Sequence, residues 1–200
     1  MPRKKEFDRE AVLRLAIAVF CAKGYSGAST DDLLRHMKIG RQSMYDTFGD
    51  KRALFLEALQ RYNADSIAEF CHHLRGGGAS SPLAGLRSAL YHYADKSPAH
   101  HSRGCMGVNA ICELGTQDKE VSHINGASAM VLGAALVNIF AEAKTNGELS
   151  TDIDEQGAAA FIGATLVGMK VNGRAGASTS QLRQLVDFAM AGFEKSVRVP

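Results

Sequence analysis

Residues 30–51, with the sequence TDDLLRHMKIGRQSMYDTFGDK, constrain the fold of this chain more than any other stretch. Their pattern predicts two short helices joined by a tight turn. Thr30 is placed to cap the first helix, and Asp31 and Asp32 follow in its first turn, where the helix dipole favours negative charge. One buried face with three-to-four spacing is formed by Leu33, Leu34 and Met37.

The second short helix is predicted over residues 41–47, after a turn at Gly40. Glycine is suited to that turn if the backbone there takes a positive φ. Met44 and Phe48 are four residues apart and are expected to face inward. The outer face is then left to Arg41, Gln42, Ser43, Tyr45 and Thr47.

The side chains of this outer face match the chemistry of a DNA groove. Arg41, Gln42 and Ser43 are expected to face base edges, because Arg and Gln side chains read bases through hydrogen bonds. Phosphate contacts are expected from hydroxyl groups, from helix-start N–H groups and from positive charge. The candidates for these contacts are Thr30, Tyr45, Thr47 and Lys51. The whole arrangement follows the logic of a helix-turn-helix that binds double-stranded DNA.

The N-terminal quarter resembles the TetR family of transcriptional regulators. A first helix ends near phenylalanine and glycine in AVFCAKGYSGAST, and a glycine turn and recognition helix follow in IGRQSMYDTFGDK. The match covers about fifty residues in order and spacing, from Phe7 to Leu59. One departure is acidic: Asp46 is expected to repel phosphate unless it points away or accepts a hydrogen bond from cytosine.

Beyond this head the apolar spacing is helical throughout, and no segment alternates as a strand does. The pattern predicts an all-α protein of about nine helices, with a DNA-binding domain at residues 1–52 and a regulatory domain at residues 53–200. Residues 1–62 hold 12 Lys and Arg against 8 Asp and Glu, whereas the rest is slightly acidic. A basic head on an acidic body fits a DNA reader with a regulatory domain.

The resemblance implies a homodimer, a palindromic operator, repression and a small-molecule effector that releases the DNA. It places the dimer contact on the last two helices, where small residues such as Gly163, Ala164 and Gly168 permit close approach. It also places an effector pocket among the middle helices. Candidate lining residues are Tyr91, His92, Cys105, Met106, Asn109, Cys112, Glu113, Met130 and Phe140; packing in the core is the alternative role for each of them.

Two other functions remain open. A thiol- or metal-sensing regulator is suggested by Cys105 and Cys112, with His100 or His101 as further ligands. However, seven helical residues span ~10 Å, too far for a direct disulfide, and no HxxxH or CxxC spacing indicates a metal site. A small helical enzyme or carrier is the other alternative, although GxSxG motifs, phosphate-binding glycine loops and metal quartets are missing from the sequence. We therefore expect no cofactor and no catalysis.

The cellular setting follows from the same sequence. No apolar run follows the basic N-terminus, so no signal peptide is expected, and no stretch of ~18 uninterrupted apolar residues predicts a transmembrane helix. The four cysteines do not form a disulfide framework by their spacing. The sequence predicts a cytoplasmic protein without a membrane partner.

Overall fold

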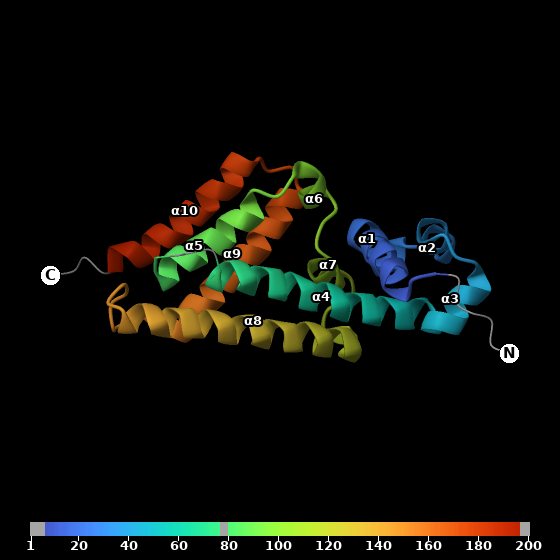
Figure 1. The fold of residues 1–200 in the computed structure, drawn as a ribbon, viewed down its shortest axis with the longest axis horizontal. Coiled ribbons are helices and arrows are strands. Elements are labelled where there is room, and N and C mark those ends of the chain that lie inside the picture. The colour runs from blue at the N-terminus through green and yellow to red at the C-terminus, as the bar shows by residue number, and fades with distance from the viewer. Residues whose placement is uncertain (1–6, 77–79, 197–200) are drawn as a thin grey trace. The chain divides into compact units, whose positions relative to one another are not determined.

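The computed structural model describes residues 7–76 and 80–196. All regular structure within these ranges is helical, which confirms the predicted all-α class (Figure 1). The α-helices are α1 (Arg9–Gly27), α2 (Thr30–Met37), α3 (Arg41–Phe48), α4 (Lys51–Arg75), α5 (Pro82–Ala94), α6 (Pro98–Ser102), α7 (Met106–Leu114), α8 (Lys119–Thr145), α9 (Glu155–Arg174) and α10 (Thr179–Ser196), with a 3₁₀ turn at Gly115–Gln117.

Helix α6 is a short helix that begins with Ser97 as its N-cap and Pro98 in its first turn. Its formation has a local cause: the Ser97 hydroxyl accepts a hydrogen bond from the His100 backbone N–H at 3.2 Å. Pro98 then occupies the first turn, where a missing N–H costs nothing. A single turn of helix therefore separates α5 from the segment that leads to α7.

The described residues divide into two compact units. The first contains residues 7–64 and 105–126, and the second contains residues 65–76, 80–104 and 127–196. Helices α4 and α8 each contribute residues to both units. The functional division expected after residue 52 stays a prediction, because packing does not show which residues bind DNA.

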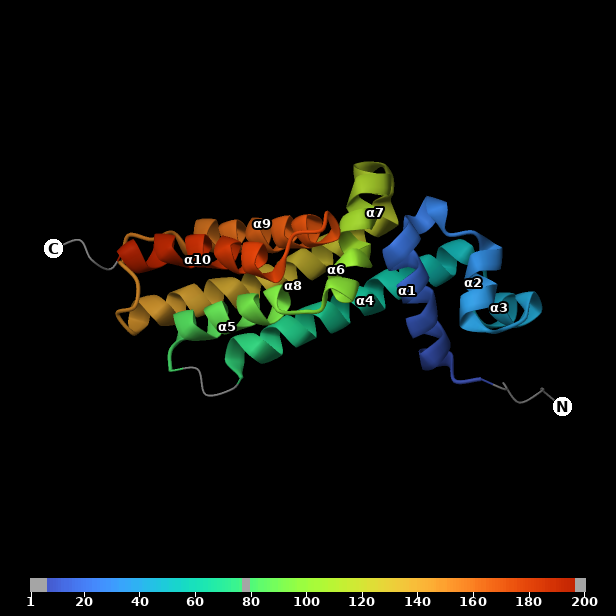
Figure 2. The same ribbon diagram turned by 90° about the horizontal axis from the view of Figure 1, so that it is seen from above.

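Each unit has its own apolar core. In the first unit the largest fully buried side chains include Phe20, Leu33, Met44, Phe55 and Met106. In the second unit, residues of α5, α8, α9 and α10 meet around Leu86, Leu90, Leu136, Phe140 and Ile162. Helices α9 and α10 lie side by side (Figure 2). Two separate clusters allow each unit to hold its own helices in place.

Helix α8 is long and apolar enough, by length and composition alone, to cross a membrane. Its most apolar 18-residue stretch has a mean hydropathy of 1.7, and 17% of that stretch is buried. The sequence predicts no such helix when only uninterrupted apolar runs are counted. Core helices of proteins that never enter a membrane pass the same test, so this property by itself gives α8 no membrane role.

Candidate DNA-binding surface

Helix α2 begins with a side-chain cap, but the capping residue differs from the expected one. The Ser29 hydroxyl accepts a hydrogen bond from the Asp32 backbone N–H at 3.1 Å, and Thr30 is the first helical residue. The prediction of Thr30 as the cap was therefore wrong by one position. Ser29 takes the role because its extended backbone directs the hydroxyl back at the first turn.

The turn between α2 and α3 also differs in detail from the prediction. Lys38 has the left-handed conformation, with φ 56°, whereas Gly40 has φ −71° and acts as the N-cap of α3. The expected positive φ at Gly40 was wrong. The chain reverses at the end of α2, so Lys38, two residues before Gly40, takes the left-handed conformation.

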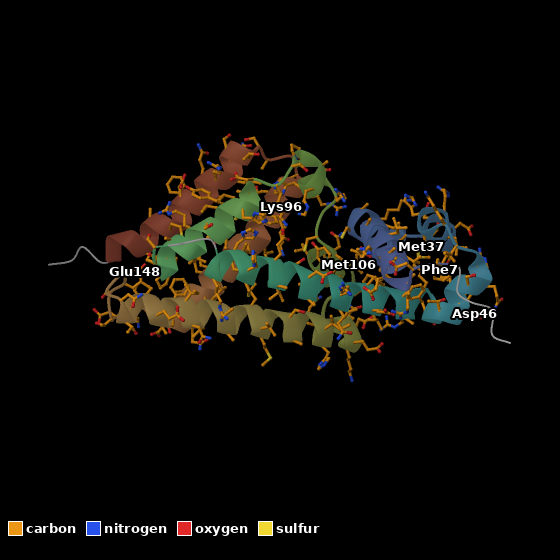
Figure 3. All side chains as sticks on the ribbon, viewed as in Figure 1. Phe7, Met37, Asp46, Lys96, Met106 and Glu148 are labelled. Carbon is orange, nitrogen blue, oxygen red and sulfur yellow. The ribbon has the colours of Figure 1, made fainter. Side chains whose placement is uncertain are left out.

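Four of the five residues predicted to face inward on the helix pair are buried, and the fifth, Leu34, is half-buried. Leu33 and Met44 are fully buried, and Met37 and Phe48 are 2% and 6% exposed. Figure 3 labels Met37 on α2 and Asp46 on α3, and only Met37 belongs to the core. These four apolar side chains fix the rotation of both helices, so that the remaining face of α3 must point to solvent.

The outward side of α3 carries the polar residues expected to contact DNA. Arg41, Gln42 and Tyr45 are exposed, and Tyr45 has 43% of its surface accessible. Ser43 and Thr47 are half-buried. An exposed arginine and glutamine at the start of an eight-residue helix can enter a major groove, where both residue types bind base edges.

Both of these base-reading candidates are held by carboxylates in the free protein. The Arg41 guanidinium lies 2.6 Å from Asp31 Oδ1, and the Gln42 amide donates to Asp46 Oδ1 at 2.8 Å. Asp46 thus accepts a hydrogen bond from its own helix. The i,i+4 spacing of Gln42 and Asp46 was a usable sequence signal, but the Arg41–Asp31 pair depends on how α2 and α3 pack.

A second ion pair fixes α1 against α2. Lys23 Nζ lies 2.7 Å from Asp32 Oδ2. This lysine, followed by the Ser29 hydroxyl, lowers the pKa of Asp32 to about 2. Asp32 is therefore ionised at every physiological pH. The position of α2 on α1 is set by this contact and by the apolar core together.

The start of α4 supplies the last candidate DNA contact, Lys51. Its ammonium group lies 4.5 Å from the centre of the Tyr25 ring, close enough for a cation–π contact. Asp50 caps α4 by accepting a hydrogen bond from the Ala53 backbone N–H at 2.7 Å. The Tyr25 contact joins the end of α1 to α4 and has no local signal in the sequence. The contact orients a positive charge without neutralising it.

Five of the proposed effector-binding residues lie on or beside α7, which packs against α1 in the first unit. Cys105 and Met106 are buried, whereas Cys112 is exposed. Asn109 donates to the Cys21 carbonyl at 2.9 Å, and Glu113 Oε2 accepts from the Ser26 backbone N–H at 3.0 Å. The two polar side chains expected to meet a ligand therefore bind the backbone of α1.

The remaining four candidates lie in the second unit and do not share one site. Phe140 is fully buried in the core, and Met130 is 76% exposed on α8. Tyr91 and His92 lie on α5 and line an open groove of about 830 Å³. The Tyr91 hydroxyl bonds the carboxylate of Asp187, and this bond raises the pKa of Tyr91. Among the nine candidates, Tyr91 and His92 thus share one groove, and an effector role for any of them stays a prediction.

Comparisons with known proteins agree with the geometry of α2 and α3. Residues 12–58 match the family model described as bacterial regulatory proteins, tetR family. The HTH-type transcriptional regulator YezE of Bacillus subtilis is 31% identical over 194 residues, which cover 96% of this chain and 98% of YezE. The transcriptional repressor ComR of Escherichia coli is 26% identical over 190 residues, covering 92% of this chain and 87% of ComR.

The same agreement holds among solved structures. A cysteine mutant of the TetR family regulator CifR, complexed with 26bp double-strand operator DNA, aligns with a TM-score of 0.81 and 26% identity. The alignment covers 96% of this chain and 99% of that one. The chain belongs to the TetR family and is a DNA-binding transcriptional regulator.

Proposed function

We propose that this protein is a repressor that binds a palindromic double-stranded operator and releases it when a small molecule binds. The observation that carries this proposal is the exposure of Arg41 and Gln42 at the start of α3. Burial of Met44 and Phe48 on the opposite side of the same helix directs these two side chains to solvent. ComR is named as a repressor, and CifR was solved with operator DNA. Both relatives span nearly the whole chain, which supports transferring this role.

The proposed division of labour separates base reading from phosphate binding. Arg41, Gln42 and Ser43 contact base edges and carry the sequence preference. The phosphates are bound by Thr30, Tyr45, Thr47 and Lys51. Arg41 has to break its contact with Asp31 before it can reach a base. Gln42 either breaks its hydrogen bond to Asp46 or contacts a base while that bond is kept.

The proposed homodimer uses the apolar face that α9 and α10 leave uncovered in a single chain. Within the described residues this face carries large side chains of which at least 39% of the surface is exposed: Phe161, Val167, Val171, Leu185 and Phe188. Large exposed apolar side chains clustered on two adjacent helices are typical of protein–protein contacts. A two-fold dimer presents two copies of α3, as a palindrome requires.

The proposed effector site is the groove beside α5. Its walls carry both apolar and charged groups, among them Leu83, Arg87, Tyr91 and His92. A few polar groups on a partly apolar wall suit a small ligand. We further propose that the protein acts in the cytoplasm and catalyses no reaction, as its regulator relatives suggest.

Selection of duplexes from a random DNA pool by the purified protein, at two salt concentrations and with no added metal, tests this proposal. We expect enrichment of one palindrome at both concentrations, since base contacts persist when phosphate contacts are screened. Binding that enriches no sequence and disappears at the higher salt concentration would instead indicate a non-specific basic surface. The proposed function would then be wrong.

A further inference from the structure

Three metal-ligating side chains come together where α4 and α5 meet in the second unit. Within the ranges that the structure describes, Glu69, His73 and His92 form a group whose ligand atoms all lie within 4.8 Å of one another. None of the three is fully buried. His73 and His92 line the groove beside α5, whereas Glu69 is outside the lining of that groove.

Helix geometry explains why these side chains converge. Glu69 and His73 are four residues apart on α4 and therefore share one face of that helix. His92 reaches the same place from α5. Adjacent histidines such as His72 and His73 point in different directions on a helix, so nearness in the sequence does not make a metal site here. The useful pair is separated by nineteen positions in the sequence and is created by packing.

Two of the three ligand atoms are already as close together as two atoms that bind one metal ion. His92 Nε2 lies 3.0 Å from Glu69 Oε1. Donor atoms at ~2.0–2.1 Å from a tetrahedral metal lie roughly 3.3 Å from each other, so these two atoms need little movement to share an ion. Lys96 Nζ donates to the other oxygen, Glu69 Oε2, at 2.6 Å. The lysine thereby orients the carboxylate and leaves Oε1 directed at the histidine.

His73 supplies the third ligand after a rotation of its ring. In the structure its ring is stacked on that of His92, with centres 3.6 Å apart and planes inclined by 20°. Stacked imidazoles direct their lone pairs nearly in parallel, so the His73 ring has to turn out of the stack to coordinate. Burial, followed by repulsion from His92 and His72, lowers the pKa of His73 below its ordinary value.

We propose that Glu69, His73 and His92 bind a divalent transition-metal ion of the class that prefers imidazole, such as Zn²⁺, Ni²⁺ or Co²⁺. Two imidazoles and one carboxylate occupy three positions and leave at least one for water or another donor. His73 and His92 also line the groove proposed for the effector, so the open position can face that groove. Any regulatory effect of the metal rests on the proposed function, but metal binding itself does not.

Charged side chains around the three ligands reduce the affinity expected for a metal ion. Lys96 places a positive charge next to Glu69, which opposes a cation, whereas the carboxylate itself favours one. Asp95 lies on the wall of the same groove but is engaged by Arg183 through two hydrogen bonds of 2.6 Å. We therefore expect a weaker site than a fully assembled structural zinc site.

The test is titration of the chelator-treated, full-length protein with Co²⁺ and Ni²⁺ in the absence of DNA, followed by calorimetry and visible absorption. We expect one ion per chain and a Co²⁺ spectrum without thiolate charge-transfer bands. His73→Ala and His92→Ala should each weaken binding by about 10- to 100-fold or more. The matched control is His72→Ala, the exposed neighbour outside the group, which should bind like the wild type.

Three results would overturn the proposal: no stoichiometric binding, thiolate bands that assign the ion to cysteines, or equal weakening by His72→Ala and His73→Ala. Folding of each variant is checked by circular dichroism, and Glu69→Gln provides a second variant that retains the shape of the side chain. Duplex selection is carried out without metal. A failure of metal binding can therefore be distinguished from a failure of the proposed DNA-binding function.

Discussion

The ion pair between Arg41 and Asp31 should oppose DNA binding, and its removal should make binding tighter. The two groups are 2.6 Å apart, with side chains 56% and 74% exposed. Exposed pairs of this kind contribute ~0.2–1 kcal/mol. If Arg41 leaves Asp31 to reach a base, this free energy is lost at each half-site.

Replacement of Asp31 by Asn removes that cost. A dimer with two copies of Arg41 should gain about 0.4–2 kcal/mol in binding free energy, which corresponds to roughly 2- to 30-fold higher affinity. Fluorescence anisotropy with the selected operator measures this change. Asp152→Asn is the charge-matched control, because Asp152 is exposed in the second unit, far along the chain from α3.

The same substitution made in an Arg41→Ala background distinguishes loss of the ion pair from loss of a negative charge near the DNA. Loss of a carboxylate near phosphates tightens binding whether or not Arg41 is present, whereas release of Arg41 requires Arg41. The gain from Asp31→Asn should therefore be smaller in the Arg41→Ala background. An equal gain in both backgrounds, or no gain in the wild type, would refute the argument that Asp31 holds Arg41 back.

Three further perturbations test other parts of the structure. Gly24 has φ 71° and an added Cβ would lie 1.6 Å from Glu113 Oε1, so Gly24→Ala should lower the free energy of unfolding by about 1–3 kcal/mol in chemical denaturation. Phe188 is 82% exposed on α10, and Phe188→Glu should shift the protein from dimer to monomer in sedimentation velocity. Burial raises the pKa of Glu69, but hydrogen bonds from Lys96 and His92 outweigh it and hold the pKa at about 2, below its ordinary 4.5. Because the folded pKa is depressed, the wild type should be more stable than Glu69→Gln above pH 4.5 and lose that advantage as the pH falls toward 2.

The helix-turn-helix could be predicted because its determinants are local. Apolar spacing of three and four residues identified the buried faces of α2 and α3, and burial of Leu33, Met37, Met44 and Phe48 confirms it. The two wrong predictions in this region, the N-cap of α2 and the residue with positive φ, were each displaced by only one or two residues. Ser29 and Thr30 are adjacent hydroxyl residues, and composition alone does not decide which of them has the extended backbone of a cap.

The parts that could not be predicted depend on packing between distant segments. Asn109 and Glu113 share a helical face, as expected, but nothing in their spacing shows that this face meets the backbone of α1. The pairing of His73 with His92 likewise requires α5 to lie against α4. The sequence named Asn109, Glu113 and His92 as candidates, whereas their partners became visible only in three dimensions.

The measurement that tests the central claim most directly is duplex selection repeated with Gln42→Ala and with Lys51→Ala. If α3 reads base edges, Gln42→Ala should change the preferred base at one position in each half-site, with discrimination there altered by ~1–3 kcal/mol. Lys51→Ala should weaken binding to all sequences alike and flatten the dependence on salt. An unchanged preferred sequence for Gln42→Ala, together with a changed one for Lys51→Ala, would contradict the account.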